Sequence, residues 1–227
     1  MKIIFSDTVG IDNKYFPKPA QKFIPEWYKQ MPSYLTGKRE LNEDAETNGT
    51  AKKCIPIFDA MTAGYLIFSP ADVMVTQKDG FPYYQWASHD LIKFHPVDQA
   101  PNHPNRNNHP ISYPKWMNPW GIKTPKGYSC LFTAPKHRDN PFTILDGIVD
   151  TDSYLAPVNF PFVLNDVKFK GLIPAGTAIA QVIPFKRDSF EMEISVNQSD
   201  RLKSINKLRS VFFDSYKTQF WTKKEYK

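Results

Sequence analysis

The chain has 227 residues, 41% of them hydrophobic and 15% aromatic, with 29 basic and 23 acidic side chains. Such a length fits one large domain or two small ones, and it buries enough surface to form a core without a metal or a disulfide. The aromatic content excludes a disordered chain, and no apolar run reaches the ~18–20 residues of a membrane span. The first residues lack the apolar stretch of a secretory signal, so the cytosol is the expected compartment.

The positions of the charges and cysteines add two constraints. Residues 199–227 hold eight basic and three acidic side chains, so most of the formal net charge of +6 lies in this tail. These lysines and arginines are more typical of the solvated side of an amphipathic helix than of a nucleic-acid contact. Cys54 and Cys130 belong to no Cys-x-x-Cys motif, so we expect two buried, reduced thiols.

The first 54 residues predict a segment with one short helix and one mobile loop. Lys2–Phe5 is typical of a strand. Phe23–Met31 is typical of a helix, because Pro25 falls near the first turn, where a missing N–H costs little. From Thr36 to Lys53 only Leu41 is strongly apolar, so we expect a polar surface loop there.

Residues 55–198 predict a mostly antiparallel β-domain. Short runs rich in branched and aromatic residues are separated by Gly and Pro, which is typical of a β-sandwich or a closed β-structure. The turn Lys78-Asp79-Gly80 predicts a hairpin, and residues 98–110 predict a second long loop. The expected strands are Tyr65–Phe68, Asp72–Thr76, Tyr83–Ala87, Leu91–His95, Gly121–Thr124, Tyr128–Ala134, Ile144–Val149, Ala156–Leu164, Phe169–Ile173, Ala178–Phe185 and Phe190–Val196.

The final segment, residues 199–227, predicts a basic amphipathic helix from about Asp200 to Phe220. Apolar residues recur there at steps of three and four, and Ser199 or Asp200 can cap the start. We expect the apolar face to dock on the β-domain or on a neighbouring subunit; the alternative is a partner or a membrane surface. The face consists of Leu202, Ile205, Leu208, Phe212, Tyr216 and Phe220.

The usual catalytic motifs are missing from the sequence. It contains no Gly-x-Ser-x-Gly nucleophile motif and no Gly-x-x-x-x-Gly-Lys phosphate loop. The five histidines form no His-x-His pair, and His103 and His109 are expected to be solvated. His95, with Gln99 four residues later, fits a structural histidine better than a metal ligand or a base, although both roles stay open.

Four short segments between Trp120 and Arg187 occur in a characteristic order. They are Pro125-Lys126-Gly127-Tyr128, Pro135-Lys136-His137-Arg138, Gly147-Ile148-Val149-Asp150-Thr151-Asp152-Ser153-Tyr154 and Gly176-Thr177-Ala178-Ile179-Ala180-Gln181. In this order they resemble the core of the dUTPase and dCTP-deaminase superfamily. The resemblance covers less than a third of the chain and implies an all-β, dUTPase-like β-clip or sandwich that assembles as a homotrimer.

The resemblance also implies site residues. Asp150 matches the acid that orients the attacking water, Asp152 the second acid of that segment, and Tyr154 the ring that packs on the deoxyribose. Ser153 displaces Tyr154 by one position, which turns a side chain in extended backbone to the opposite face. The implied phosphate-binding residues are Lys136, Arg138 and Gln181.

The departures from the family pattern weigh against its activity. His137 and Arg138 replace a serine and a glycine of the phosphate segment, and the glycine-rich C-terminal arm has no counterpart. Most of the chain also resembles a group of uncharacterised proteins of tailed phages. The matching residues are Ile24-Pro25-Glu26-Trp27-Tyr28, Cys54-Ile55-Pro56-Ile57-Phe58-Asp59 and Asn118-Pro119-Trp120.

Two readings of function follow from these resemblances. The first is a phage protein in the host cytoplasm or the virion that uses a dUTPase-like scaffold non-catalytically, for assembly or partner binding, with no cofactor. The alternative is a nucleotide phosphohydrolase in which Asp150 activates water, with Mg²⁺ as cofactor. A plainer reading of Asp150 and Asp152 is that they cap the turn after a strand.

Overall fold

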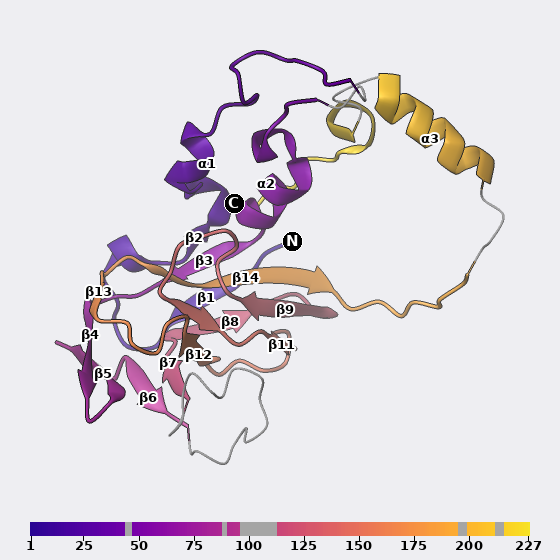
Figure 1. Ribbon diagram of the computed structural model, residues 1–227. Helices are drawn as coiled ribbons and strands as arrows, with labels where there is room; N and C mark the ends of the chain where they lie inside the picture. The colour runs from indigo at the N-terminus through magenta and orange to yellow at the C-terminus, as the bar shows by residue number, and fades with distance from the viewer. Residues whose placement is uncertain (44–46, 88–89, 96–112, 195–198, 212–215) are drawn as a thin grey trace. The chain divides into compact units, whose positions relative to one another are not determined.

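The computed structural model describes residues 1–43, 47–87, 90–95, 113–194, 199–211 and 216–227 (Figure 1). The chain divides into two compact units, and each is considered by itself. Residues 1–25 and 61–187 form one, here called the β-unit; residues 26–60 and 188–227 form the other, the helical unit. The whole of the long loop expected at 98–110, with Gln99, His103 and His109, lies outside the described residues.

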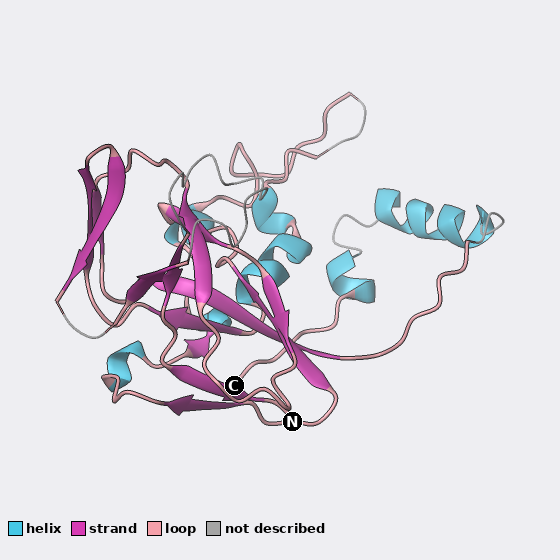
Figure 2. Ribbon diagram, turned by 90° about the horizontal axis from the view of Figure 1, so that it is seen from below, coloured by secondary structure: helices cyan, strands magenta, loops and turns pink. Residues whose placement is uncertain are grey.

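The β-unit contains antiparallel sheets, seen as magenta arrows in Figure 2. Among the described residues the strand orders are β1-β8, β10-β12-β7-β6, β11-β9-β14-β3-β2 and β13-β4-β5. The predicted fold class, all-β and mostly antiparallel, is therefore confirmed. The strands are β1 Ile4–Asp7, β2 Lys18–Pro19, β3 Tyr65–Phe68, β4 Val73–Lys78, β5 Phe81–Trp86, β6 Ile92–Phe94, β7 Pro114–Trp116, β8 Trp120–Lys123, β9 Tyr128–Thr133, β10 Phe142–Ile144, β11 Gly147–Val149, β12 Phe160–Leu164, β13 Gly171–Ile173 and β14 Ala178–Lys186.

Strand β14 is the centre of the five-stranded sheet. It pairs with β9 from Gln181 to Lys186 and with β3 from Ala178 to Val182. Gly64, which precedes β3 at φ +66°, lies so close to β14 that an added Cβ would sit 1.9 Å from the Val182 carbonyl oxygen. Only a glycine fits this approach, so the entry to β3 is fixed by its missing side chain.

The hairpin between β4 and β5 turns as the sequence predicts. Asp79 and Gly80 both have positive φ, +52° and +83°, and Lys78 pairs directly with Phe81. A two-residue loop with two positive φ values is the turn that matches the right-handed twist of paired strands.

Aromatic side chains fill the core of the β-unit. Trp116 on β7 is fully buried and stacks on Phe162 of β12 with 5.2 Å between ring centroids, and Phe142 of β10 packs against both. Tyr84 of β5 meets Phe162 edge-on at 5.7 Å. Such pairs are worth about 0.5–1.5 kcal/mol beyond burial, so these rings tie the β4–β5 hairpin to the neighbouring sheet.

The helical unit is built from short elements. These are α1 (Glu26–Gln30), α2 (Ile55–Thr62, whose last two residues belong to the β-unit), α3 (Ser199–Val211) and a π-helical turn at Tyr216–Phe220. Lys52 links the segment before α2 to α1, because its Nζ donates to the Tyr28 and Lys29 carbonyl oxygens. No helix among the described residues is long and apolar enough to cross a membrane.

Three expected elements differ from the structure. The single strand expected at Ile144–Val149 is two strands of different sheets, β10 and β11. The β-domain was expected from residue 55, but Ile55–Thr62 is helical: Pro56 is tolerated in the first turn, where an N–H would be unpaired, and Ala60 and Met61 favour helix. A strand was expected at Phe190–Val196, but residues 190–194 pair with no strand among the described residues; residues 195 and 196 lie outside the described part.

Four side chains of the apolar face expected on the C-terminal helix are described. Ile205 is partly buried, whereas Leu202 is 57% exposed, Tyr216 45% and Phe220 48%. Docking of this face on the β-domain or on a neighbouring subunit stays a prediction.

Candidate functional site

The two aspartates singled out from the sequence lie in the turn that follows β11. Val149 of β11 pairs with Cys130 of β9, so the next residue, Asp150, lies beside Ser129 at the start of β9. The Asp150 carbonyl oxygen accepts from the backbone N–H groups of Ser153 and Tyr154, at 3.1 and 2.9 Å. This tight turn aims both carboxylates at the same end of β9.

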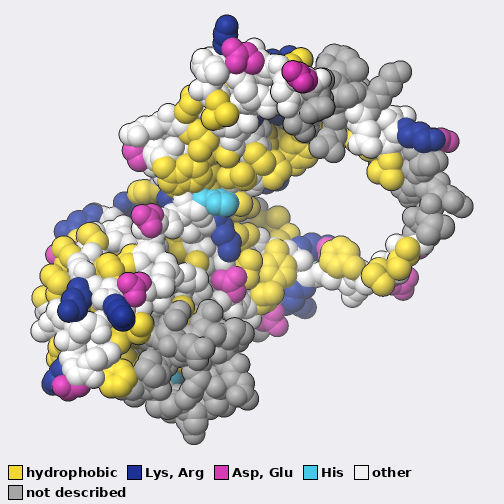
Figure 3. All heavy atoms as spheres, viewed as in Figure 1, with side chains coloured by type: hydrophobic (Ala, Val, Ile, Leu, Met, Phe, Trp, Pro, Cys, Tyr) yellow, Lys and Arg dark blue, Asp and Glu magenta, His cyan; other side chains and the backbone are white. Residues whose placement is uncertain are grey.

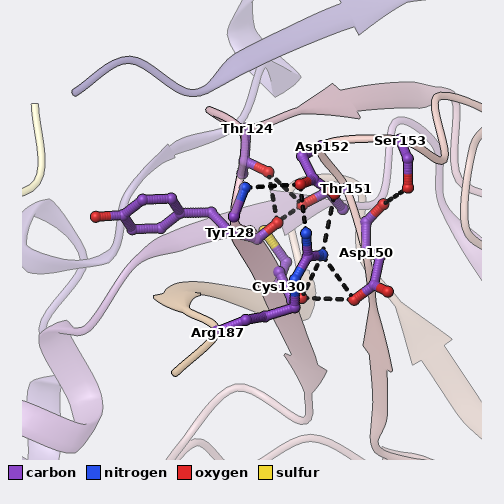
Figure 4. A network of polar contacts seen from close by, with 10 residues as sticks. Thr124, Tyr128, Cys130, Asp150, Thr151, Asp152, Ser153 and Arg187 are labelled. Atoms are coloured by element: carbon purple, nitrogen blue, oxygen red, sulfur yellow. Dashed lines mark hydrogen bonds and ion pairs between the residues drawn. The ribbon is translucent and has the colours of Figure 1, made fainter. Parts of the chain in front are cut away.

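Arg187, directly after β14, binds both carboxylates (Figure 4). Its Nη1 lies 2.9 Å from Asp150 Oδ1 and 3.0 Å from Asp152 Oδ1, and its Nη2 donates to Asp152 Oδ2. The Arg187 backbone N–H donates to the Gly127 carbonyl oxygen at 2.8 Å, which fixes the end of β14 against the turn before β9. Together, Gly127, Ser129, Asp150, Asp152 and Arg187 are here called the Arg187 cluster.

Asp152 is the most enclosed acid of the cluster. Its side chain is 8% exposed and also accepts from the Gly127 N–H at 2.8 Å. The hydrogen bonds from Arg187 and then from Gly127 lower the pKa of Asp152 to about 2, and the same bond from Asp152 raises the pKa of Arg187. Asp152 is therefore a fixed anion at neutral pH, held by donors of its own chain.

Asp150 is more open. Its side chain is 61% exposed, and Oδ1 accepts from the Ser129 hydroxyl at 2.6 Å. That hydrogen bond, followed by the one from Arg187, holds the pKa of Asp150 below its usual value. A carboxylate with a lowered pKa is a weaker proton acceptor, although its exposed side can still meet solvent.

Buried hydroxyl groups form a second set of hydrogen bonds next to the Arg187 cluster. Thr124 and Thr151 share a hydrogen bond of 2.8 Å, the Thr124 hydroxyl also contacts the Tyr128 carbonyl oxygen, and the Thr151 hydroxyl donates to Cys130 Sγ at 3.3 Å. Burial raises the pKa of the Cys130 thiol, so it is a neutral group. Both cysteines are free thiols as expected, Cys130 buried and Cys54 partly buried.

Two of the three residues expected to bind phosphate, Lys136 and Gln181, lie at the other end of β9. Gln181 pairs with Thr133, four residues along the strand from Ser129, or about 13 Å. Gln181 is fully buried, accepts from the Lys136 backbone N–H at 2.9 Å, and donates to the Ala63 carbonyl oxygen at 2.7 Å. The Lys136 ammonium group donates to the Thr133 hydroxyl at 2.6 Å. Gln181 therefore joins the middle of β14 to the end of β9 and the entry to β3, and has no exposed surface for a ligand.

Arg138 and Tyr154, the two remaining residues of the expected site, differ in exposure. The Nε and Nη2 atoms of Arg138 are buried without a hydrogen-bond partner in the described part of the chain, and this burial lowers the pKa of Arg138. Tyr154 is 51% exposed on the turn after Asp150.

A metal site does not fit this arrangement. Within the described residues, no three His, Cys, Asp or Glu side chains are grouped so that they could hold a metal ion. The two carboxylates that could contribute oxygen ligands already hold the Arg187 guanidinium, whose charge repels a cation.

Arg187 and Ser129 were not singled out from the sequence. Arg187 lies 35 residues after Asp152 and Ser129 lies 21 before Asp150. They meet only because β14 and β11 flank β9 on opposite sides. Knowing that strand order would have identified them, because Arg187 directly follows the central strand.

Fold and site together define an all-β protein with a paired-acid and arginine cluster at one strand end. No protein-family model and no curated protein matches the chain. Among solved structures it is similar to a mutant dUTPase from phage phi11 of S. aureus, described with a structural Mg(II) ion. The TM-score is 0.33 and the identity 14%, covering 60% of this chain and 85% of that one. A likeness at this level says nothing about activity.

Proposed function

We propose that this chain is a phage protein that uses its β-unit as a non-catalytic scaffold for assembly or partner binding, in the host cytoplasm or in the virion. The observation that carries the proposal is the state of the two acids. Asp150 and Asp152 both bind Arg187, and Asp152 is almost enclosed by donors of its own chain. An acid enclosed like Asp152 joins β9, β11 and β14 rather than facing a substrate, and the Arg187 bond gives Asp150 the same structural role.

The opposite end of β9 supports the same proposal. Hydrolysis of a nucleotide needs cations placed on the phosphate oxygens next to the attacking water. Lys136 and Gln181 lie at the far end of the strand from Asp150, and the Gln181 amide is used inside the chain. The groups that would share one substrate are thus divided between two ends of a strand.

Thermal unfolding with a panel of deoxynucleoside triphosphates and Mg²⁺ tests this proposal. A ligand at 100 times its Kd stabilises a protein by about 2.7 kcal/mol, which is a readily measured rise in Tm. We expect no rise and no release of phosphate or pyrophosphate. Turnover of any nucleotide that is lost in Asp150→Asn would overturn the scaffold proposal.

One observation favours the alternative, a nucleotide phosphohydrolase. Asp150 is 61% exposed beside the Arg187 guanidinium, which is a position from which a carboxylate can orient water next to a bound anion. In that case Arg187, rather than Lys136 or Arg138, would hold the phosphate. Turnover lost in both Asp150→Asn and Arg187→Met, and kept in Lys136→Met, would support this alternative.

The scaffold proposal includes a homo-oligomer, and a trimer is the form that the sequence resemblance implies. Light scattering of the purified chain is the direct measurement, with an expected mass of three times 26.2 kDa. A mass near one chain at micromolar concentration would contradict the homo-oligomer.

A further inference from the structure

The β-unit contains a pocket that is separate from the Arg187 cluster. Strand β8 lies between the two places. Thr124, directly after β8, donates its backbone N–H to the Thr151 carbonyl oxygen next to the cluster, whereas Asn118, just before β8, contacts Asn159. Thr124 and Asn118 are six residues apart in the sequence, which is up to about 20 Å along a strand. Asn118 and Asn159 line the pocket, so it belongs to the other end of β8.

Backbone hydrogen bonds bring together the segments that line this pocket. The Thr8 backbone N–H and hydroxyl both donate to the Pro119 carbonyl oxygen, at 3.0 and 2.8 Å, and so hold the segment after β1 against the one before β8. The Met117 N–H donates to the Leu91 carbonyl oxygen at 2.9 Å and adds the segment before β6, while Asn159 adds the segment before β12. The space between them is about 490 Å³, within the range of about 300–1,000 Å³ typical of small-molecule sites.

The walls of the pocket are mostly apolar. Exposed apolar side chains alone do not define a binding surface, and Figure 3 shows them mixed with charged side chains on the face of the protein seen there. In the pocket, by contrast, apolar side chains surround a hollow, and three of them are prolines, which have no N–H to be paired. Such walls suit an apolar group of a ligand. They include Val9, Ile11, Pro70, Leu91, Pro119 and Pro157.

An amide group in the wall has an unused donor. The half-buried Asn159 accepts the Asn118 backbone N–H at 3.1 Å through Oδ1, which fixes the side-chain amide and leaves Nδ2 without a hydrogen-bond partner among the described residues. Asn118 is itself held, because its amide donates to and accepts from the Trp120 backbone at 2.9 and 3.1 Å. Asn159 Nδ2 is therefore a positioned donor for a carboxylate or carbonyl oxygen of a ligand.

An ion pair of opposite charges also lines the pocket. Lys93 Nζ lies 2.7 Å from Asp90 Oδ2, and the two side chains are 50% and 75% exposed. Strand register puts Lys115 of β7 beside Lys93, which adds a second positive charge there. A phosphate or a nucleotide would be repelled by Asp90. A zwitterion with its ammonium and carboxylate groups on one carbon can face Asp90 and Lys93 together.

We propose that this pocket binds a free α-amino acid with an apolar side chain. The carboxylate of the ligand accepts from Asn159 Nδ2 and Lys93 Nζ, its ammonium group donates to Asp90, and its side chain packs on the apolar walls. This ligand uses the unpaired amide donor, both charges of the ion pair and the apolar lining. The site is a further binding function of the β-unit, and it requires neither assembly nor nucleotide hydrolysis.

Ligand analogues test the chemistry of the proposal. Thermal unfolding is measured with L-leucine, L-methionine and L-phenylalanine up to about 10 mM, and a rise in Tm that grows with concentration is expected. Two analogues of leucine keep the side chain and lose one charge: 4-methylpentanoate lacks the ammonium group and 3-methylbutylamine lacks the carboxylate. Each should bind at least about tenfold more weakly than L-leucine. No rise with any of the three amino acids, or equal binding of either analogue, would overturn the proposal.

Variants test the place of binding, with the Kd of L-leucine measured by calorimetry. Asp90→Asn and Lys93→Met should each raise this Kd about tenfold. Val9 is 51% exposed, so Val9→Trp can fill the pocket without opening the core, and it should abolish binding while the circular dichroism spectrum stays unchanged. Lys78→Met, which removes an exposed lysine outside the pocket, is the matched control and should bind as wild type. A Kd that is unchanged in all three pocket variants would show that leucine binds elsewhere and would overturn the proposal.

Discussion

The two ends of β9 are bonded to neighbouring segments by different kinds of polar group. At the start of the strand, charged groups meet in the Arg187 cluster, where Asp150 is 61% and Arg187 37% exposed. At the far end a neutral amide, Gln181, is fully buried and joins Lys136 to Ala63. Water reaches the charged end. It weakens each ion pair, but it can also solvate a charged group that loses its partner. The neutral end has no water to replace a lost bond, so it is the less tolerant of the two.

Removing the buried amide should therefore have the largest effect. Gln181→Leu leaves the Ala63 carbonyl and the Lys136 N–H without partners, and each unsatisfied buried group costs about 1–3 kcal/mol. We expect a loss of about 2–5 kcal/mol in the free energy of unfolding, measured by urea denaturation. Gln85→Leu, on the exposed side of β5, is the control and should change little. Equal effects of the two variants would contradict the comparison.

Removing the guanidinium tests the charged end. Arg187→Met takes the partner from both acids and leaves Asp152 with the Gly127 N–H alone. We expect Tm to fall by several degrees, less than in Gln181→Leu, because water can reach Asp150. Arg187→Lys keeps the charge but loses the planar guanidinium that binds two acids at once, so its Tm should lie between those of wild type and Arg187→Met. A larger loss in Arg187→Met than in Gln181→Leu would reverse the ranking.

Acid should weaken only the charged end. The folded-state pKa of Asp152 is about 2, below the ordinary value of 3.8, so its contribution to stability is present above the ordinary value and is lost as pH falls from there towards 2. Denaturation midpoints measured at a series of pH values should therefore fall in that window. In Asp152→Asn the denaturation midpoint should decrease less over this pH window. In Gln181→Leu the midpoint should depend on pH as steeply as in wild type.

The smallest effect is expected at Ser129. The Ser129 hydroxyl is the main cause of the lowered pKa of Asp150, so Ser129→Ala should move that pKa back towards its usual value. Because Asp150 is exposed and keeps Arg187, Tm should hardly change. Carboxyl chemical shifts followed against pH measure the change, and an unaltered Asp150 pKa would show that Arg187 alone sets it.

The sequence predicted the strands well, because they follow from local patterns. Asp79-Gly80 supplies the two positive φ values of a hairpin, and the run Ala178–Phe185 matches β14 almost residue for residue. It failed at Ile55–Thr62, where a helix of eight residues has too few turns for an apolar period to stand out.

The site was less predictable, because it depends on strand order. Asp150 and Asp152 were selected from a motif, but their partner Arg187 is determined by β14 lying beside β9. The same register separates Lys136 and Gln181 from the acids, although in the sequence all four stand within about fifty residues. Distance along the chain carries no information about which end of an antiparallel strand a residue reaches.

The position of β14 has a mechanical consequence. The chain leaves this strand at Arg187 and continues into residues 188–194, so a pull on these residues enters the β-unit through β14. The strand is paired on both sides, and a force along its axis loads its hydrogen bonds together in shear instead of opening them one by one. Arg187 lies at the loaded end and binds Asp150, Asp152 and Gly127 there. Single-molecule stretching with the handle at Ile194 should therefore meet high resistance in wild type and yield earlier in Arg187→Met.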